Sequence, residues 1–321
     1  MPCYRPLTAY YNTQVGEVVW SENHTHGNAR QISLPCGQCI GCKLQRANDW
    51  ATRCSHEASL HTCNMFGTFT YAEEKLATRS LCHRDWQLFA KKLRNALSRK
   101  WSANSIEISD SLYYTADMGL RPIPQLKYYM AGQYGSRTRR PHFHACLFGI
   151  DMSDKKYWYR NENGDAVYTS TTLDELWGNG FTSIGSVTYE SAAYIARYIV
   201  DKKTGPNAGQ YYQHIDEDGV ITDLEPEYNR MSLSEGIGKR WLKKFQTDVY
   251  PHGNVITRGK ANKAPKFYDK IYKNKEPDKF DAMKAEREFQ AAKQAHDNTL
   301  QRLQQKERVK LAQLNQLTRS L

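Results

Sequence analysis

Runs of β-branched and aromatic residues predict the strands of a sheet. One run covers residues 64–71, and two more cover residues 126–133 and 142–150. The connection between the last two is short, basic and rich in turn-forming residues. Because such a connection favours antiparallel pairing of its flanking strands, we expect a β-hairpin here. Residues 181–187 are a further strand candidate, and residues 151–180 have the polar character of an insertion with a short helix near its end.

Apolar residues spaced three and four apart predict two amphipathic helices, at residues 83–100 and 188–202. In the second helix, Tyr194 and Tyr198 lie one turn apart on the polar half, and Thr188 offers an N-cap. The aliphatic half, which can be buried against a sheet, contains Ala192, Ala193, Ile195, Ala196, Ile199 and Val200. Gly205-Pro206-Asn207 is a stop signal for this helix.

The predicted mixture of strands and helices indicates an α+β fold. We divide the chain into four segments: a cysteine-rich N-terminal element at 1–60, a central domain at 61–205, a basic region at 206–277 and a helical tail at 278–321. The tail is rich in Ala, Gln, Lys, Glu and Leu, a composition that predicts one long helix.

The charge of the chain favours a polyanionic partner. Lys and Arg number 45 against 34 for Asp and Glu, a formal net charge of +11. Residues 239–275 are the most basic block, with aromatic residues interleaved among the cations. Cations can contact a DNA backbone while rings stack on bases; the alternative is a solvated face whose rings turn inward. The cations that we expect at DNA are Arg139, Arg140, Arg197, Lys239, Arg240, Lys243 and Lys244.

We find no apolar run that approaches the length of a membrane span, and no apolar signal segment follows Met1. These features predict a cytosolic protein with reduced cysteines. Three cysteines are clustered, at Cys36, Cys39 and Cys42, a spacing that indicates a metal site. Structural zinc takes four ligands, which Cys3, Cys54 or His56 could complete, and we assign Cys3. Part of an iron–sulfur signature and unligated thiols are the alternatives.

Candidate chemistry lies in the second predicted hairpin strand and in the tyrosine helix. His142 and His144 are two residues apart, so in a strand they project from the same face and can bind one divalent ion. Gln133, just before the turn, offers a third ligand. Histidines with only local hydrogen bonds are the alternative. Tyr194 and Tyr198 are candidate nucleophiles for two successive transesterifications, unless they merely rim a packed helix.

These motifs resemble those of the HUH endonucleases, and in particular the rolling-circle replication initiators of small icosahedral single-stranded DNA phages of the gokushovirus type (Microviridae). The similar segments are residues 66–71, 133–135 with 140–144, 194–198 with 201–203, the cysteine cluster, and 231–241. The resemblance implies a central antiparallel sheet of ferredoxin-like or palm type with helices packed on it. It also implies Mg²⁺ or Mn²⁺ at His142 and His144, and Tyr194 and Tyr198 as nucleophiles, with Lys202 beside them. The family often has Glu where Gln133 stands.

The implied function is initiation of rolling-circle replication. A tyrosine would nick single-stranded origin DNA, form a 5′-phosphotyrosine link, free a 3′-hydroxyl and later rejoin the strand. A relaxase or transposase of the same superfamily is one alternative; a non-catalytic zinc- and DNA-binding phage protein is another. The sequence contains no P-loop with which to drive unwinding, so a host helicase would be a partner. A host polymerase would be another partner, and the expected location is the bacterial cytoplasm.

Overall fold

The computed structural model describes residues 3–25, 29–76, 78–98, 106–108, 114–115, 119–120, 125–135, 137–202, 208–215 and 218–316. Within these, the side chains of residues 25, 114–115, 119–120 and 198–201 are outside the description. The helix stop predicted at residues 205–207 lies outside the described residues. The chain divides into two compact units, Met1–Arg46 with Tyr272–Arg319, and Ala47–Ile271. The division into four segments stays a prediction. Most of the predicted segment 1–60 and the predicted tail 278–321 belong to the same compact unit.

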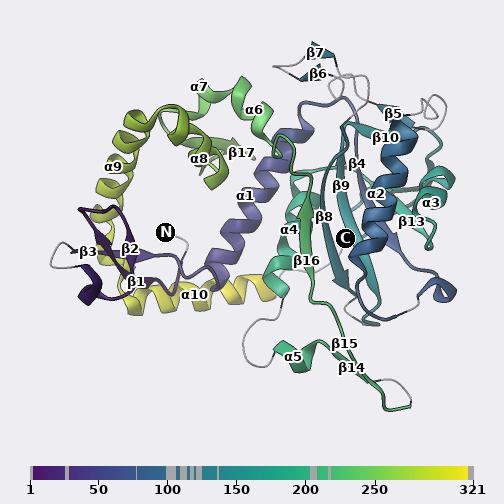
Figure 1. Ribbon diagram of the computed structural model, residues 1–321, viewed down its shortest axis with the longest axis horizontal. Helices are drawn as coiled ribbons and strands as arrows, with labels where there is room; N and C mark the ends of the chain where they lie inside the picture. The colour runs from purple at the N-terminus through teal and green to yellow at the C-terminus, as the bar shows by residue number, and fades with distance from the viewer. Residues whose placement is uncertain are drawn as a thin grey trace. The chain divides into compact units, whose positions relative to one another are not determined.

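A seven-stranded antiparallel sheet forms the centre of the larger unit (Figure 1). In spatial order its strands are β11 (Lys156–Arg160), β12 (Ala166–Thr169), β13 (Thr182–Gly185), β4 (Asn64–Thr70), β9 (Pro141–Phe148), β8 (Lys127–Tyr134) and β16 (Tyr228–Met231). The predicted strands and the β8–β9 hairpin are therefore confirmed, as is the α+β class.

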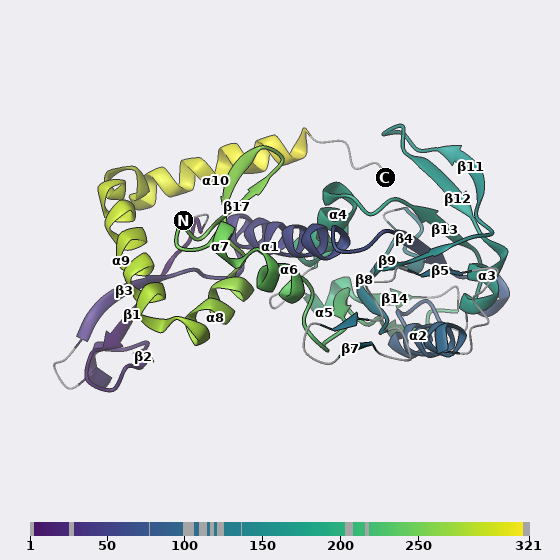
Figure 2. The same cartoon turned by 90° about the horizontal axis from the view of Figure 1, so that it is seen from above.

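The interpretation of residues 151–180 as an insertion was wrong in one respect. Strands β11 and β12 from this segment extend the sheet beyond β13, where Figure 2 shows them at its edge. The segment also contains most of β10 (Ile150–Met152), which pairs with β5 (Ile106–Ile108), and α3 (Thr171–Trp177), the predicted short helix. β11 is exposed along its whole length, although three of its five residues are aromatic.

One face of the sheet is covered by α2 (His83–Ser98) and α3. Phe143, Ala145 and Leu147 of β9 point into this layer and are fully buried with Trp86 and Trp177. The apolar stripe of α2 predicted from its spacing is the stripe that faces the sheet. Burial of these rings against β9 fixes which way its alternate side chains point.

The opposite face is covered by α4 (Tyr189–Asp201) and by residues 47–58 of α1 (Ile40–Ala58). Ala192, Ile195 and Ala196 are completely buried there, so this part of the aliphatic half packs on the sheet as predicted, while the side chains of Ile199 and Val200 lie outside the described residues. Thr188 caps α4: its Oγ1 accepts from Ser191 N at 3.1 Å, while Ser191 Oγ accepts from Thr188 N at 2.8 Å. Side chains on the even-numbered residues of β9 point toward this layer.

The smaller unit combines an N-terminal sheet with the C-terminal helices. Its strands are β1 (Leu7–Asn12), β2 (Val18–Val19) and β3 (Ala29–Leu34), with a 3-10 turn at Glu22–Thr25. The predicted single tail helix was wrong: α9 (Pro277–Lys293) ends before a 3-10 turn at Ala295–Asn298, and α10 (Leu300–Asn315) begins after it. Thr299 ends the continuity because its hydroxyl caps α10, accepting from Arg302 N.

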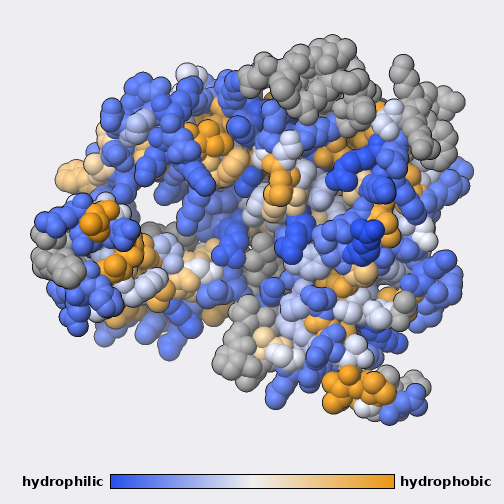
Figure 3. Space-filling view, viewed as in Figure 1, coloured by the Kyte–Doolittle hydropathy of each residue, from blue (hydrophilic) through white to orange (hydrophobic). Residues whose placement is uncertain are grey.

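The remaining described helices and strands are short. They are the 3-10 turn Glu73–Lys75, the helices α5 (Ala208–Tyr211), α6 (Lys239–Lys244), α7 (Gln246–Val249) and α8 (Lys266–Lys275), and the strands β6 (Tyr114–Thr115), β7 (Gly119–Leu120), β14 (Gln213–Ile215), β15 (Ile221–Asp223), β17 (Asn254–Thr257) and β18 (Lys260–Lys263). The face seen in Figure 3 is mostly hydrophilic, with an apolar patch over β14 and β15, where Ile215, Val220 and Ile221 are exposed. Among the described helices, none combines the length and apolar character of a membrane span.

Candidate metal centre and nucleophile

The two histidines of β9 lie on the sheet face covered by α4. The strand register places His142 between Gln133 of β8 and Thr70 of β4, and His144 between Ala131 and Thr68. The imidazole rings have centroids 5.0 Å apart and are perpendicular. This geometry follows from strand alternation, because Phe143 between them is buried in the opposite layer.

Each imidazole has its Nδ1 held by the protein. Nδ1 of His142 lies 3.1 Å from the carbonyl oxygen of Arg140, and Nδ1 of His144 lies 2.9 Å from Oγ1 of Thr68. A histidine that donates from Nδ1 to an oxygen presents Nε2 to a metal ion. Burial lowers the pKa of His142, and burial followed by the neighbouring His142 lowers the pKa of His144 well below its usual value. Both rings are therefore neutral, the form that binds a metal.

Gln133 completes this set of donors. Its side-chain nitrogen lies 2.5 Å from Nε2 of His142, while its Oε1 is buried and has no hydrogen-bond partner among the described residues. Amide nitrogen and oxygen are assigned from hydrogen bonding, and exchanging them turns the oxygen toward His142. The amide of Gln133 thus lies beside Nε2 of His142, and His144 projects from the same face, a donor set that fits a divalent cation.

Tyr194 brings a phenol to this site from α4. Its ring centroid is 5.2 Å from that of His144, at an interplanar angle of 82°, and its side chain is half-buried rather than fully outward. The backbone of α4 places Tyr198 one turn further on, but the nucleophile predicted there rests on a side chain outside the described residues. Lys202 follows directly after α4 and is half-buried. A phenol beside two neutral imidazoles and an amide is an arrangement suited to attack on a cation-bound phosphate.

The predicted DNA-contacting arginines near the site have different environments. Arg139 donates from Nη2 to the carbonyl of Tyr211 at 2.7 Å, and Arg140 pairs with Glu73 and donates to the carbonyl of Tyr71. Arg197 lies on the exposed side of α4. Arg139 and Arg140 thus already brace the β8–β9 turn, whereas Arg197 presents its side chain to solvent.

In the basic block, the interleaved rings turn inward. Trp241 stacks on His56 with ring centroids 3.5 Å apart, and Tyr250 and Tyr268 are buried. The sequence left open whether these rings stack on bases or turn inward, and the structure has these three rings packed within the protein. On α6, Lys239, Lys243 and Lys244 remain exposed.

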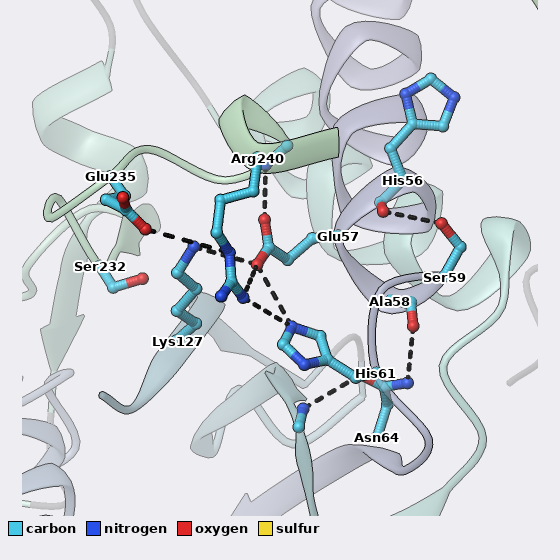
Figure 4. A network of polar contacts seen from close by, with 12 residues as sticks. His56, Glu57, Ala58, Ser59, His61, Asn64, Lys127, Ser232, Glu235 and Arg240 are labelled. Atoms are coloured by element: carbon cyan, nitrogen blue, oxygen red, sulfur yellow. Dashed lines mark hydrogen bonds and ion pairs between the residues drawn. The ribbon is translucent and has the colours of Figure 1, made fainter. Parts of the chain in front are cut away.

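Arg240 points into the protein instead. Its guanidinium reaches Oε1 of Glu57 at 3.4 Å, and Glu57 also receives Lys127 Nζ at 3.0 Å and the Gly238 N–H at 2.8 Å (Figure 4). Burial disfavours a charged Glu57, but His61, Lys127 and Gly238 lower its pKa to about 2. Arg240 is therefore engaged in a buried ion network, and the DNA contacts that we retain in α6 are the three lysines.

Four thiols of the smaller unit converge on one point. The Sγ atoms of Cys3, Cys36, Cys39 and Cys42 all lie within 4.8 Å of one another. Cys3 Sγ is 3.7 Å from that of Cys36 and 3.9 Å from that of Cys39. Sulfurs around a tetrahedral zinc ion are about 3.8 Å apart, given Zn–S bonds of about 2.3 Å. The cluster could therefore hold a structural metal such as zinc, with Cys3 as the fourth thiol.

Backbone amides support these sulfurs. The N–H of Tyr4 points at Cys39 Sγ, that of Cys36 at Cys3 Sγ, and that of Cys39 at Cys36 Sγ, each at 3.3 Å. Such donors stabilise thiolates. Cys54, the other cysteine considered as a ligand, lies in the core beneath the central sheet. None of the eight cysteines forms a disulfide.

Thr68 is the site residue that sequence reasoning missed. It lies in the strand-forming run 64–71, but only the β4–β9 register brings it opposite His144. The register between two strands cannot be read from one strand alone. The one signal for Thr68 in the sequence was that its hydroxyl lies two residues from that of Thr70, so both project from the same face of the predicted strand.

Comparisons with known proteins agree with these motifs. The family model for replication-associated protein ORF2/G2P matches residues 64–203. The replication-associated protein VP4 of Bdellovibrio phage phiMH2K is 33% identical over 281 residues, covering 87% of this chain and 80% of that protein. The replication-associated protein ORF2 of Spiroplasma virus 4 is 29% identical over 310 residues, covering 90% and 86%. No solved structure matches.

A third relative, the replication-associated protein ORF4 of Chlamydia phage 1, is 25% identical over 173 residues, covering 53% of this chain and 38% of that protein. The family model falls on the segment that contains both histidines and both tyrosines. The resemblance identified from the motifs is confirmed, and the chain belongs to the family of phage replication-associated proteins.

Proposed function

We propose that this protein nicks single-stranded origin DNA and thereby initiates rolling-circle replication. The observation that supports this most directly is the approach of Tyr194 to His144, on the sheet face where Gln133 and His142 also lie. A nucleophile and a set of cation ligands face one point, and the chain belongs to a replication-associated family.

In the proposed reaction the phenol oxygen of Tyr194 or Tyr198 attacks the phosphorus of one phosphodiester. The bond from phosphorus to the 3′ oxygen breaks, the phenol loses its proton, and the departing oxygen takes up a proton. The products are a 5′-phosphotyrosine and a free 3′-hydroxyl that can prime synthesis. Bound Mg²⁺ or Mn²⁺ would neutralise charge on the phosphate as the transition state forms.

The remaining residues have supporting roles in this proposal. The second tyrosine of the pair would attack when the replicated strand is released, and reversal of the reaction would rejoin the strand without a nucleotide cofactor. Lys202, at the end of α4, would hold a phosphate. Arg197, with Lys239, Lys243 and Lys244 on α6, would contact the DNA backbone. Host helicase and polymerase in the bacterial cytoplasm would supply unwinding and synthesis.

The four-thiol cluster is proposed to bind one structural Zn²⁺. Zinc there would tie Cys3, near the N-terminus, to the three cysteines that precede and begin α1, and would stabilise a unit with few buried apolar residues.

A covalent-adduct assay tests the nicking proposal. The protein is mixed with labelled single-stranded origin DNA and Mn²⁺, and the products are separated under denaturing conditions. We expect a protein–DNA band that disappears in Tyr194→Phe/Tyr198→Phe. The matched control is Tyr157→Phe, an exposed tyrosine on β11, which should retain the band. Tight DNA binding without any adduct in the unaltered protein would instead favour the non-catalytic alternative.

A further inference from the structure

We propose, resting on the function above, that Trp158 and Phe181 form a stacking platform for unpaired bases of the DNA strand beside the nick site. The platform lies on the edge hairpin β11–β12 and the start of β13, on the sheet face that bears the histidines.

The strand registers determine which face each ring occupies. Tyr157 pairs with Tyr168, which pairs with Ile184, and Ile184 is buried in the layer under α2 and α3. A β-bulge at Trp158 shifts the register, so Tyr159 pairs with Val167, the neighbour of Tyr168 on the opposite face. Tyr159, and the Trp158 ring beside it, therefore lie on the face that carries His142 and His144. The ring of Trp158 meets that of Phe181 with centroids 5.1 Å apart.

Phe181 is hydrogen-bonded to Thr70 of β4, and Thr70 in turn pairs with His142 of β9, the candidate metal-binding strand. The Phe181 carbonyl accepts from both N and Oγ1 of Thr70, at 2.9 and 2.8 Å, and Thr70 is the direct partner of His142. Two strand spacings, roughly 10 Å, therefore separate Phe181 from His142. The rings thus lie along a direct path across the sheet from the candidate reaction centre.

Both rings are available to a partner. Trp158 is 52% exposed and Phe181 is 41% exposed. Tyr159 continues the row, since its ring centroid is 4.7 Å from that of Trp158. Large exposed rings that adjoin one another mark a binding surface more often than an ordinary exterior.

The charges beside the rings select the partner. Within β11 the charged residues are Lys156 and Arg160, both exposed, while the acidic residues of this hairpin, Glu162 and Asp165, lie in its turn. A partner that matches both features carries negative charge and accessible aromatic faces. Single-stranded DNA has both, whereas duplex DNA keeps its base faces stacked within the helix.

Equilibrium binding to two single-stranded probes tests the platform. One probe is dye-labelled oligothymidylate, and the other is an abasic chain of equal length with the same phosphates and no bases. We expect Trp158→Ala and Phe181→Ala to weaken binding to oligothymidylate by about tenfold or more, and to leave binding to the abasic chain unchanged. Trp158→Phe, which keeps an aromatic face, should restore most of the affinity.

Tyr157→Ala is the matched control, because it removes a ring that is 59% exposed on the same strand but on the other face. It should leave binding to both probes unchanged. The platform is rejected if Trp158→Ala and Tyr157→Ala behave alike, or if the losses are equal for both probes. Unchanged affinity in Trp158→Ala would point to a protein partner for this surface and would also reject it.

The binding assay and the adduct assay can reject the stacking platform and the nicking proposal independently of each other. Absence of any covalent adduct in the unaltered protein would overturn the nicking proposal, while the two-probe comparison would still measure stacking. An adduct in the unaltered protein together with unimpaired oligothymidylate binding in Trp158→Ala would overturn only the platform.

Discussion

At the scale of single residues, the histidine pair owes its orientation to hydrogen bonds from outside the pair. The Arg140 carbonyl and the Thr68 hydroxyl each hold an Nδ1, so both Nε2 atoms are directed to one side of the sheet. Outer partners of this kind commonly change metal affinity or activity by about ten- to a hundredfold when removed. The orientation of the imidazoles is thus as much a part of the candidate site as the imidazoles themselves.

Thr68→Val should therefore weaken metal-dependent strand cleavage by about ten- to a hundredfold, because His144 loses the partner of its Nδ1. Cleavage rates measured over a range of Mn²⁺ concentrations check this. Thr68→Ser, which retains the hydroxyl, is the control and should remain close to the unaltered protein. Full activity of Thr68→Val at low Mn²⁺ would contradict the role given to this hydroxyl.

Glu57 is a second residue whose removal has a predictable cost. Glu57→Gln removes the carboxylate that pairs with buried Lys127 and leaves Glu235, at 3.9 Å, as the carboxylate that pairs with Arg240, so we expect a loss of about 3 kcal/mol in the free energy of unfolding at neutral pH. Denaturant titration measures it. Glu175→Gln, an exposed carboxylate on α3, is the control and should change stability little.

The pH dependence of this loss follows from the lowered pKa of Glu57. A depressed carboxyl pKa contributes stability fully above its usual value of 4.5, and the contribution disappears as pH falls toward about 2. The difference in stability between the unaltered protein and Glu57→Gln should therefore be constant near neutral pH and shrink below about pH 4.5. A difference that does not change over this acidic range would argue against an ionised Glu57.

At the scale of elements, the start of β13 decides where the exposed ring of Phe181 lies. Gly180 has φ +155, and an added Cβ would come within 2.4 Å of the Ala72 nitrogen and 2.6 Å of the Thr70 carbonyl oxygen. Only glycine lets the chain approach the end of β4 so closely. The close approach of Gly180 to the end of β4 thus holds the start of β13 next to the strand that pairs with the histidine strand.

Gly180→Ala should cost about 3 kcal/mol or more, because strain in the backbone adds to overlap with backbone atoms that cannot move aside. Gly164→Ala is the matched control: its φ is +85, but nothing lies within 4 Å of the added Cβ, so we expect only about 1–2 kcal/mol. Thermal unfolding compares the two. Equal destabilisation would show that the approach of β13 to β4 is looser than described.

At the scale of the whole molecule, the two units have different sources of stability. The larger unit has an apolar layer on each face of its sheet, whereas the smaller unit has a buried cluster formed by cysteines. Besides the cysteines, the buried apolar side chains among the described residues of this unit are Ala9, Tyr272, Met283 and Leu303, and a unit with so small an apolar core commonly depends on a cross-link or a metal. The two units should therefore respond differently when metal is removed.

Purified protein should contain about one zinc ion per chain, and a strong chelator should lower the thermal stability of the smaller unit more than that of the larger one. Elemental analysis and a two-phase melting curve check this. Cys36→Ser should remove the zinc, while Cys82→Ser, a cysteine outside the cluster, should keep it. Full zinc occupancy in Cys36→Ser would reject the four-thiol site.

With a net charge of +11, the proposed DNA binding should depend on salt. Each phosphate contact on a single strand contributes about 0.7 to the slope of log affinity against log salt, so replacing Lys239, Lys243 and Lys244 by Gln should reduce that slope by about 2. The control replaces Lys91, Lys92 and Arg94 of α2, exposed on the far side of the sheet, and should change it less. If both sets of substitutions reduced the salt slope equally, the three α6 lysines would contribute only a general attraction to DNA and no specific phosphate contacts.

The sequence by itself determined the local features of this protein. Strand alternation placed His142 and His144 on one face with Phe143 in the core, and helical spacing buried Ala192 and Ile195 beneath Tyr194. These follow from periods of two and 3.6 residues, which are properties of the chain over short distances.

The tertiary structure alone decided what lies across those faces. It set Thr68 beside His144, brought the Tyr194 ring against His144, selected Cys3 from the candidate fourth ligands and turned Arg240 inward to Glu57. It also joined β11 to the sheet and divided the tail helix at Thr299. Each of these depends on register, packing or capping between neighbours in space, and periodicity within a single segment contains no information about which distant segment it will meet.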